Sequence, residues 1–309
     1  MDLKVILFSC AVLISQTLGY KCKFEDRKNL GYICGLEPYQ RINDERHVPG
    51  KSDDDVTRVE FFGYWNQITP LSQSGVPICE RFKNLKRIEV EKLEIGENLF
   101  KNCKNLEKLY ISNSEFMNIS DNFVTDSPKL NTLMLRGCKL TTLPENIFNN
   151  QKQLTVLILD DNQISFLPPN TFKPLRNLQS LYLNNNRLQT LNQDWFKSLL
   201  NLKVLSLRGN GITDLPKHIF IFLYNLEQIY LANNKLTAIH SDSFELQTKL
   251  SIINLFNNRV NEIDERLIDR TAVKFFNMFQ NVCSNEDISE RNQIKQKLQK
   301  CFDNYQPRK

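Results

Sequence analysis

The sequence lacks the features that mark most membrane-spanning, nucleic-acid-binding and metal-dependent proteins. After residue 19, no segment has the roughly 18 consecutive apolar residues that a membrane-spanning helix requires. The net charge of +5 over 309 residues is modest and dispersed, so we expect no nucleic-acid partner. Only three histidines occur, at His47, His218 and His240, and their scattered positions form no metal-ligand spacing.

Catalytic motifs are absent as well. The sequence has no phosphate-binding loop, no nucleophile elbow and no metal-ligand motif. We therefore expect a protein that is not an enzyme and that uses no cofactor and no metal. His218 and His240 lie at variable positions of the pattern described below, where we expect solvated imidazoles.

The segment 154–177, LTVLILDDNQISFLPPNTFKPLRN, carries the pattern that organises the chain. It reads LxxLxLxxNxIxxLPxxxFxxLxx, which is one complete leucine-rich repeat. The same pattern returns at intervals of 24 residues, and the opening leucines are Leu106, Leu130, Leu154, Leu178, Leu202, Leu226 and Leu250. One unit alone cannot bury its apolar side, so we expect the units to stack into a leucine-rich repeat solenoid of the α/β class.

Each repeat contains a short strand, because Leu157 and Leu159 alternate as inward-facing residues of a strand do. The expected shape is a curved horseshoe with a parallel β-sheet on its concave face. Asparagines follow at the turn, where their amides satisfy backbone groups left unpaired; they are Asn162, Asn186, Asn210, Asn234 and Asn258. One core position holds phenylalanines that should stack as a spine: Phe148, Phe172, Phe196, Phe220 and Phe244.

The chain divides into four predicted parts. Residues 1–19 contain a lysine, an apolar run and then small or polar residues, as a secretory signal peptide does. Residues 20–55 are an N-terminal cap and connector, 56–283 a solenoid of about ten coils, and 284–309 a C-terminal capping helix. The polar C-terminus does not resemble a lipid-anchor signal. We expect a secreted, extracellular protein without a membrane span.

Most cysteines should form disulfides outside the cell. Cys22 and Cys34 flank a partly alternating segment with a turn signal, which predicts a disulfide-closed hairpin over the first coil. Cys79 occupies the phenylalanine position of one coil, and Cys103 lies three residues after that position in the next coil. Since neighbouring coils lie about 5 Å apart, we expect a Cys79–Cys103 bond.

A second disulfide is expected at the C-terminus. Four residues lie on one side of a helix predicted over 289–302: Ile294, Leu298, Cys301 and Phe302. Cys283 stands in the last coil, where an aliphatic residue normally follows the asparagine. A Cys283–Cys301 bond would hold this helix over the exposed end of the core.

Three features have both a structural and a functional interpretation. Cys138 occupies the asparagine position of its coil, where we expect a small buried thiol; the alternative is an intermolecular disulfide, which requires exposure. The aspartates at 53–55 fit a solvated loop better than a calcium site, because calcium loops alternate their ligands. Asn118 begins an Asn-Ile-Ser sequon and is an expected glycosylation site.

The variable strand positions form the candidate binding surface. Their side chains point out from the concave face because residues alternate along a strand. The predicted partner-binding residues are Tyr110, Met134, Arg136, Ile158, Asp160, Tyr182, Arg208, Tyr230 and Phe256. Tyrosine and arginine are enriched at binding hot spots, and the apolar content exceeds what solubility requires. The alternative is that these side chains only pack against one another.

The start of the repeats has a more particular form, with the segments Gly31-Tyr-x-Cys34, Ile78-Cys79-x-x-Phe82 and Phe100-x-x-Cys103-x-Asn105-Leu106. Together with the repeats, these segments resemble insect secreted proteins, in particular the mosquito leucine-rich immune family. Long members of that family dimerise and engage a complement-like thioester protein through a double-cysteine motif and a C-terminal coiled coil. This chain has neither feature, so the resemblance implies a short form without those two properties.

Three functions agree with these observations. The first is a secreted recognition protein of innate immunity, which binds an extracellular protein or a microbial surface through the concave face; the resemblance favours it. The second is an extracellular matrix or adhesion protein. The third is a secreted inhibitor of an enzyme. The repeat pattern alone does not choose among them, and it does not determine the oligomeric state.

Overall fold

The computed structural model describes residues 23–27, 31–36, 50–62, 69–70, 77–96, 98–116 and 118–308. The chain divides into two compact units. Unit 1 comprises Met1–Cys138 and Asn149–Gln151, and unit 2 comprises Lys139–Phe148 and Lys152–Lys309. Each unit has its own stacked strands and its own buried core.

The described part of unit 1 begins with the predicted antiparallel hairpin, in which β1 (Lys23–Arg27) pairs with β2 (Gly31–Leu36). Parallel strands follow β2 in the order β3 (Val56–Phe62), β5 (Arg87–Glu91), β7 (Lys108–Ser112) and β9 (Thr132–Arg136). A smaller sheet contains β4 (Thr69–Pro70), β6 (Leu93–Ile95) and β8 (Glu115–Phe116). Two short helices, η1 (Asp53–Asp55) and α2 (Ile78–Arg81), complete the described part of the unit.

The core of unit 1 is closed by cysteines. Cys79 and Cys103 form a disulfide with a Cα–Cα distance of 5.1 Å. Cys34 is buried and disulfide-bonded, and Cys22, its expected partner, lies outside the described residues. Phe82 and Phe100, each three residues from a cysteine of this disulfide in the sequence, are almost completely buried. The disulfide and the aromatic packing therefore lie in the same coils.

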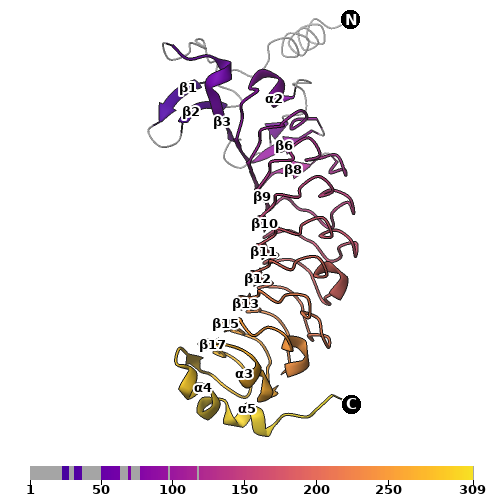
Figure 1. Ribbon diagram of the computed structural model, residues 1–309, viewed down its shortest axis with the longest axis vertical. Helices are drawn as coiled ribbons and strands as arrows, with labels where there is room; N and C mark the ends of the chain where they lie inside the picture. The colour runs from indigo at the N-terminus through magenta and orange to yellow at the C-terminus, as the bar shows by residue number, and fades with distance from the viewer. Residues whose placement is uncertain are drawn as a thin grey trace, which may run out of the picture. The chain divides into compact units, whose positions relative to one another are not determined.

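In unit 2, residues that are 24 positions apart pair on neighbouring parallel strands. Leu157 pairs with Leu181 and Leu181 with Leu205, and all three are completely buried. The parallel strands are β10 (Val156–Ile158), β11 (Ser180–Tyr182), β12 (Val204–Ser206), β13 (Gln228–Tyr230), β15 (Ile252–Asn254) and β17 (Phe275–Asn277), and they follow one another along one side of the unit (Figure 1). An antiparallel strand, β18 (Asp287–Ile288), ends this sheet.

The other side of unit 2 is built from short segments. They are η3 (Gln193–Trp195), β14 (Ala238–Ile239), η4 (Ser241–Phe244), β16 (Glu262–Ile263) and α3 (Arg266–Arg270). The predicted phenylalanine spine lies in the core beneath them. Phe148 and Phe172 stack with ring centroids 6.3 Å apart, whereas Phe220 and Phe244 are tilted at 5.2 Å. These rings are fully buried, which supports their interpretation as core.

The asparagines at the turns form the expected ladder. The Asn186 side-chain oxygen accepts a hydrogen bond from the Ile164 N–H at 3.0 Å, and its amide donates to the Leu159 and Leu183 carbonyls. Asn234 repeats this arrangement two repeats further along. Each amide therefore joins its own coil to the preceding one and satisfies buried backbone groups.

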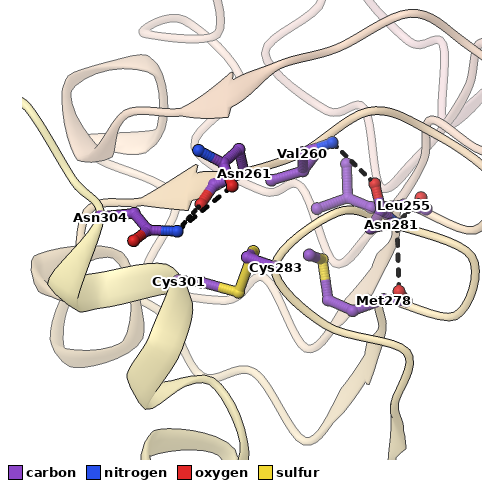
Figure 2. Close-up of a disulfide and its surroundings, with 8 residues drawn as sticks. All are labelled: Leu255, Val260, Asn261, Met278, Asn281, Cys283, Cys301 and Asn304. Atoms are coloured by element: carbon purple, nitrogen blue, oxygen red, sulfur yellow. Dashed lines mark hydrogen bonds between the residues drawn. A yellow bond between two sulfur atoms is a disulfide. The ribbon is translucent and has the colours of Figure 1, made fainter.

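Two short helices close the C-terminal end of unit 2. They are α4 (Arg291–Lys297) and α5 (Gln299–Asp303), and they replace the single helix predicted over 289–302 because Leu298 has φ −103° and ψ 8°. Ile294 and Leu298 are nevertheless buried as their spacing predicts. Figure 2 shows Cys301 of α5 bonded to Cys283, with a Cα–Cα distance of 5.1 Å.

The predicted solvated environment of His240 is wrong. His240 is only 8% exposed because Tyr305 packs against it, with ring centroids 5.5 Å apart. The contact could not be read from the repeat pattern, since 65 residues separate the two rings. His218 is partly exposed and its Nδ1 lies 2.9 Å from a Glu245 carboxylate oxygen. His47 lies outside the described residues.

The three aspartates at 53–55 form the short helix η1 of unit 1. The Asp55 carboxylate accepts hydrogen bonds from the backbone and hydroxyl of Ser52 at 2.8 and 3.1 Å. Asp53 forms an ion pair with Arg81 at 3.1 Å. These carboxylates therefore act in local capping and in an ion pair. None of the helices in the described ranges is long and apolar enough to cross a membrane.

Candidate partner-binding surface

The sheet face of unit 2 contains a hollow of about 600 Å³, here called the sheet hollow. It extends over the outward side chains of strands β11 to β17. Its lining consists of Tyr182, Asn184, Val204, Ser206, Arg208, Gln228, Tyr230, Ala232, Asn254, Phe256 and Asn277. Within unit 2, this surface brings together aromatic, amide and cationic side chains from successive repeats.

Small residues create the sheet hollow. Ser206 lies between Tyr182 and Tyr230 in the strand register, and Ala232 lies between Arg208 and Phe256 one repeat apart on each side. Neighbouring strands are about 4.8 Å apart, so each small residue leaves a space of roughly 9.6 Å between two large ones. Ser206 and Ala232 thus form the floor, and the larger side chains form the walls.

A hydrogen-bond chain holds one wall in place. The Asn184 side-chain oxygen accepts from the Ser206 hydroxyl at 2.5 Å and from the Arg208 N–H at 3.0 Å. Asp160 accepts from the Asn184 backbone at 2.7 Å and from its side-chain amide at 3.2 Å. Asp160 is therefore a support for Asn184, which in turn orders the backbone that carries Arg208.

The tyrosines of the sheet hollow interact with each other and with the same sheet. The Tyr230 hydroxyl donates to the Gln228 side-chain oxygen at 2.8 Å. Burial raises the pKa of Tyr230, and the nearby Tyr182 hydroxyl raises it further. Tyr230 therefore remains a neutral phenol at physiological pH, available as a contact residue with both a ring and a hydroxyl.

The far end of the hollow combines two asparagine amides with the stacked rings of Phe256 and Phe279, here called the aromatic step. The side-chain oxygens of Asn254 and Asn277 accept hydrogen bonds from the Phe256 and Phe279 N–H groups, each at 3.0 Å. The Phe256 and Phe279 rings are parallel, with an interplanar angle of 3° and centroids 6.1 Å apart. Phe279 is 41% exposed, so the step presents apolar surface to solvent.

The structure brings four of the predicted contact residues together in the hollow: Tyr182, Arg208, Tyr230 and Phe256. Ile158 lies at the end of β10 on the same face, outside the lining. Tyr110, Met134 and Arg136 belong to unit 1. The predicted set omits the other seven lining residues. Two of them, Val204 and Gln228, occupy a third set of outward strand positions. The signal was present, since each lies one residue before a patterned Leu205 or Ile229.

The sheet face of unit 1 is different in character. The Arg87 guanidinium lies over the Tyr110 ring at 4.3 Å from its centroid. Arg58 forms ion pairs with Glu60 at 2.8 Å and with Glu89 at 2.6 Å. Here the outward side chains contact one another, as the packing alternative for the variable strand positions predicts. Arg136, at the end of β9, is exposed.

Other candidate sites have simple local environments. Asn118 is exposed, and its glycosylation remains a prediction. Cys138 is buried, and its thiol lies 3.4 Å from the Arg136 carbonyl oxygen. Burial raises the pKa of Cys138 to about 12, so the thiol remains protonated and weakly nucleophilic. Among the residues that the structure describes, no three His, Cys, Asp or Glu side chains are grouped to hold a metal ion.

Comparisons with known proteins agree with the repeat pattern. The family model described as leucine rich repeat matches residues 128–188, 176–234 and 201–260. A solved structure of TLR13 in complex with ssRNA13 has a TM-score of 0.59 at 21% identity, covering 72% of this chain and 36% of that chain. This chain therefore spans little more than a third of the TLR13 chain. A search of the curated proteins gives no match.

Two further solved structures are similar over more of their length. A leucine-rich repeat protein of Leptospira interrogans has a TM-score of 0.57 at 21% identity, with 80% of this chain and 72% of that chain covered. A chain in the octameric complex of Latrophilin 3, Unc5D and the repeat part of FLRT2 has a TM-score of 0.63 at 18% identity, with coverage of 84% and 83%. At these identities the likeness shows the fold alone.

Proposed function

Since this is a leucine-rich repeat protein, with a fold typical of scaffolds that bind other proteins, we propose that it is a secreted recognition protein of innate immunity. It binds an extracellular protein or a microbial surface through the sheet face of unit 2. The observation that carries the proposal is the sheet hollow, where Tyr182, Arg208 and Tyr230 converge on a floor of small residues. Such residues dominate the binding energy at many protein interfaces.

Several observations support secretion. Residues 1–19 have the composition of a signal peptide. The disulfides Cys79–Cys103 and Cys283–Cys301 fit an oxidising compartment, because thiols are kept reduced in the cytosol. The role in immunity is supported by the resemblance of the N-terminal cysteine segments to the mosquito family.

The proposal favours a protein surface over a nucleic acid. One similar structure is a complex with RNA and another is an assembly of proteins, so both kinds of partner are represented among proteins of this fold. The sheet hollow of this chain has a single cation, Arg208, in its lining. Nucleic-acid binding usually requires several phosphate contacts, which this lining does not offer.

Affinity capture from the native body fluid tests the proposal. The immobilised protein should retain a specific partner, and the variant with Tyr182→Ala, Arg208→Ala and Tyr230→Ala should lose it. A matched control carries Phe166→Ala, Arg187→Ala and Tyr224→Ala, which removes exposed side chains outside the hollow. Equal capture by all three proteins would reject the sheet hollow as the binding site.

The same preparation separates the two alternatives. An enzyme that co-purifies in a one-to-one ratio and is inactive in the complex would identify a secreted inhibitor. Retention of the protein in the insoluble tissue fraction, rather than in the fluid, would identify a matrix or adhesion protein.

A further inference from the structure

We infer that the sheet hollow takes a loop of a partner protein that presents a carboxylate near an apolar side chain. The inference rests on the proposed function and specifies the chemistry of the partner. It follows from three properties of the described residues: the charge of the lining, the orientation of its amides, and the position of the aromatic step.

The charge of the lining is complementary to a carboxylate. Arg208 is exposed and is the only charged residue among those lining the hollow. Asp160 lies on the preceding strand, but Asn184 donates hydrogen bonds to both of its carboxylate oxygens. The lining therefore contains a cation and no acid that competes for it. A planar guanidinium binds a carboxylate through two parallel hydrogen bonds, the strongest polar contact available here.

The amides add donors at the other end of the hollow. Asn254 and Asn277 each use the side-chain oxygen to accept the N–H of the second following residue. This bond orients each amide so that its NH₂ group, which only donates, is the part left for a ligand. The hollow thus offers donors to carboxylate or backbone carbonyl oxygens of a partner.

The aromatic step determines where an apolar side chain of the partner would lie. Phe256 is two strands from Arg208, with Ala232 between them. Two strand spacings correspond to roughly 9.6 Å, a distance that about three residues of an extended loop cover. A loop with a carboxylate on Arg208 can therefore place an apolar side chain against Phe256 and Phe279, whose parallel rings give a flat contact surface.

Selection from a displayed library of disulfide-constrained random heptapeptides tests this chemistry, with the full protein as target. Enriched peptides should carry Asp or Glu within about three residues of an aromatic or aliphatic residue. A synthetic copy of the most enriched peptide should bind Arg208→Gln at least ~10-fold more weakly, because the variant loses a hydrogen-bonded contact between two charged groups. Phe279→Ala should also weaken binding, whereas Arg187→Gln, an exposed change outside the hollow, should not.

The outcomes separate this inference from the proposed function. Peptides that lose binding in Tyr230→Ala, but lack acidic residues and tolerate Arg208→Gln, would overturn the inference and leave the sheet hollow as a binding site. Two results would overturn both the inference and the sheet hollow as the binding site. One is that the selected peptides bind every variant of the hollow as tightly as the wild-type protein, and the other is that the selection enriches no peptide. Salt-sensitive binding of oligouridylate RNA that depends on Arg208, without acidic peptides, would overturn the inference in favour of a nucleic acid.

Discussion

At the scale of single residues, the turn asparagines link one coil to the next. The Asn186 side-chain oxygen accepts a hydrogen bond from the Ile164 N–H, and its NH₂ group donates to the Leu159 carbonyl, so one amide satisfies two backbone groups of the previous coil. It also donates to carbonyls of its own coil, at Leu183 and Asn184. Asn186 is 8% exposed, and water has little access to replace these bonds.

Replacing Asn186 with alanine should therefore destabilise unit 2. The substitution leaves the buried Ile164 N–H without its acceptor, which costs about 1–3 kcal/mol. Urea unfolding followed by circular dichroism should show this loss. Asn201→Ala is the matched control, because Asn201 makes an exposed bond to the Arg176 carbonyl. Equal losses in the two variants would contradict the structural role of the ladder.

A second recurrent position holds a left-handed backbone conformation, which the repeat pattern alone did not predict. Eight residues at this position have positive φ values: Asn113, Gly137, Asp161, Asn185, Gly209, Asn233, Asn257 and Gln280. All but the last are Asn, Asp or Gly, the residue types that tolerate this region. The first seven of these residues recur at intervals of 24 residues and the last follows after 23, and this spacing was the signal that could have predicted a sharp turn directly after each strand.

Gly209 provides a test of this position. Its φ is +69°, and an added Cβ would lie 2.2 Å from the Asn185 side-chain oxygen. Gly209→Ala should lower the free energy of unfolding by about 1–2 kcal/mol, because a non-glycine residue in this region is strained. Gly211→Ala is the control, since the nearest atom to its Cβ lies at an ordinary 3.4 Å. A Gly209 variant as stable as wild type in thermal unfolding would show that the turn relaxes without cost.

At the scale of elements, the C-terminal cap is joined to the last coil by one disulfide and by hydrogen bonds. The Asn304 amide donates to the Asn261 carbonyl at 3.0 Å, near the Cys283–Cys301 bond (Figure 2). Arg291 of α4 donates to the Val273 and Ile268 carbonyls at 2.9 and 2.8 Å. The cap thus covers carbonyl groups and apolar side chains at the end of the core.

Removing the disulfide should loosen this cap first. The double variant Cys283→Ser and Cys301→Ser should lose about 3 kcal/mol, the value expected for a loop of this size. Backbone amides of α4 and α5 should exchange with deuterium faster, whereas the amides of β11 and β12 should keep their protection. Uniform acceleration along unit 2, or no change in the cap, would contradict the local role of the bond.

Residues 304–308 form a C-terminal segment that covers His240. Besides the Tyr305 contact, Arg308 forms ion pairs with Asp214 at 2.9 Å and with Asp242 at 3.4 Å. Burial lowers the pKa of His240 below 6.5 and the Arg308 guanidinium lowers it further, while Asp242, Asp214 and Glu262 oppose the shift. Protonation of His240 in the folded state is therefore unfavourable.

This shift predicts a pH-dependent stability. Unfolded His240 binds its proton at higher pH than folded His240. The stabilisation that neutral His240 gives the folded state is therefore complete above pH 6.5 and is lost as the pH falls. The free energy of unfolding should decrease from about pH 7 to pH 5, and His240→Gln should reduce that decrease. An unchanged slope in His240→Gln would contradict the account.

The Asp264 carboxylate also has a shifted pKa, but it titrates at lower pH than His240. Burial opposes ionisation of Asp264, but hydrogen bonds from Arg266 and Ser241 hold its pKa well below the ordinary range. Its stabilisation is therefore lost only at strongly acidic pH, and it does not contribute to a slope between about pH 7 and pH 5.

The elements that could be predicted from the sequence are those that depend on the period. Leu157, Leu181 and Leu205 face the core because a constant interval produces a constant register. The contact of His240 with Tyr305 could not be predicted, since it joins segments with no common pattern. The sheet hollow was predicted only in part, because its volume arises from where the small residues Ser206 and Ala232 fall among large ones.

At the scale of the whole molecule, the repeats give each unit a buried core and an outward sheet face. In unit 2 the outward face is hollow and lined by uncharged polar, aromatic and cationic side chains. In unit 1 the equivalent side chains form ion pairs and a cation–π contact. The same fold rule therefore yields one face suited to a partner and another whose side chains contact one another.

Hydroxyl-radical footprinting of the captured complex tests the central claim most directly, because mass spectrometry reports the oxidation of each aromatic side chain. Tyr182, Tyr230 and Phe279 should be oxidised in the free protein and protected in the complex. Phe166 and Tyr224, which are 57% and 45% exposed outside the hollow, should be oxidised equally in both. Protection of Phe166 and Tyr224 with undiminished oxidation of Tyr182, Tyr230 and Phe279 would contradict the account.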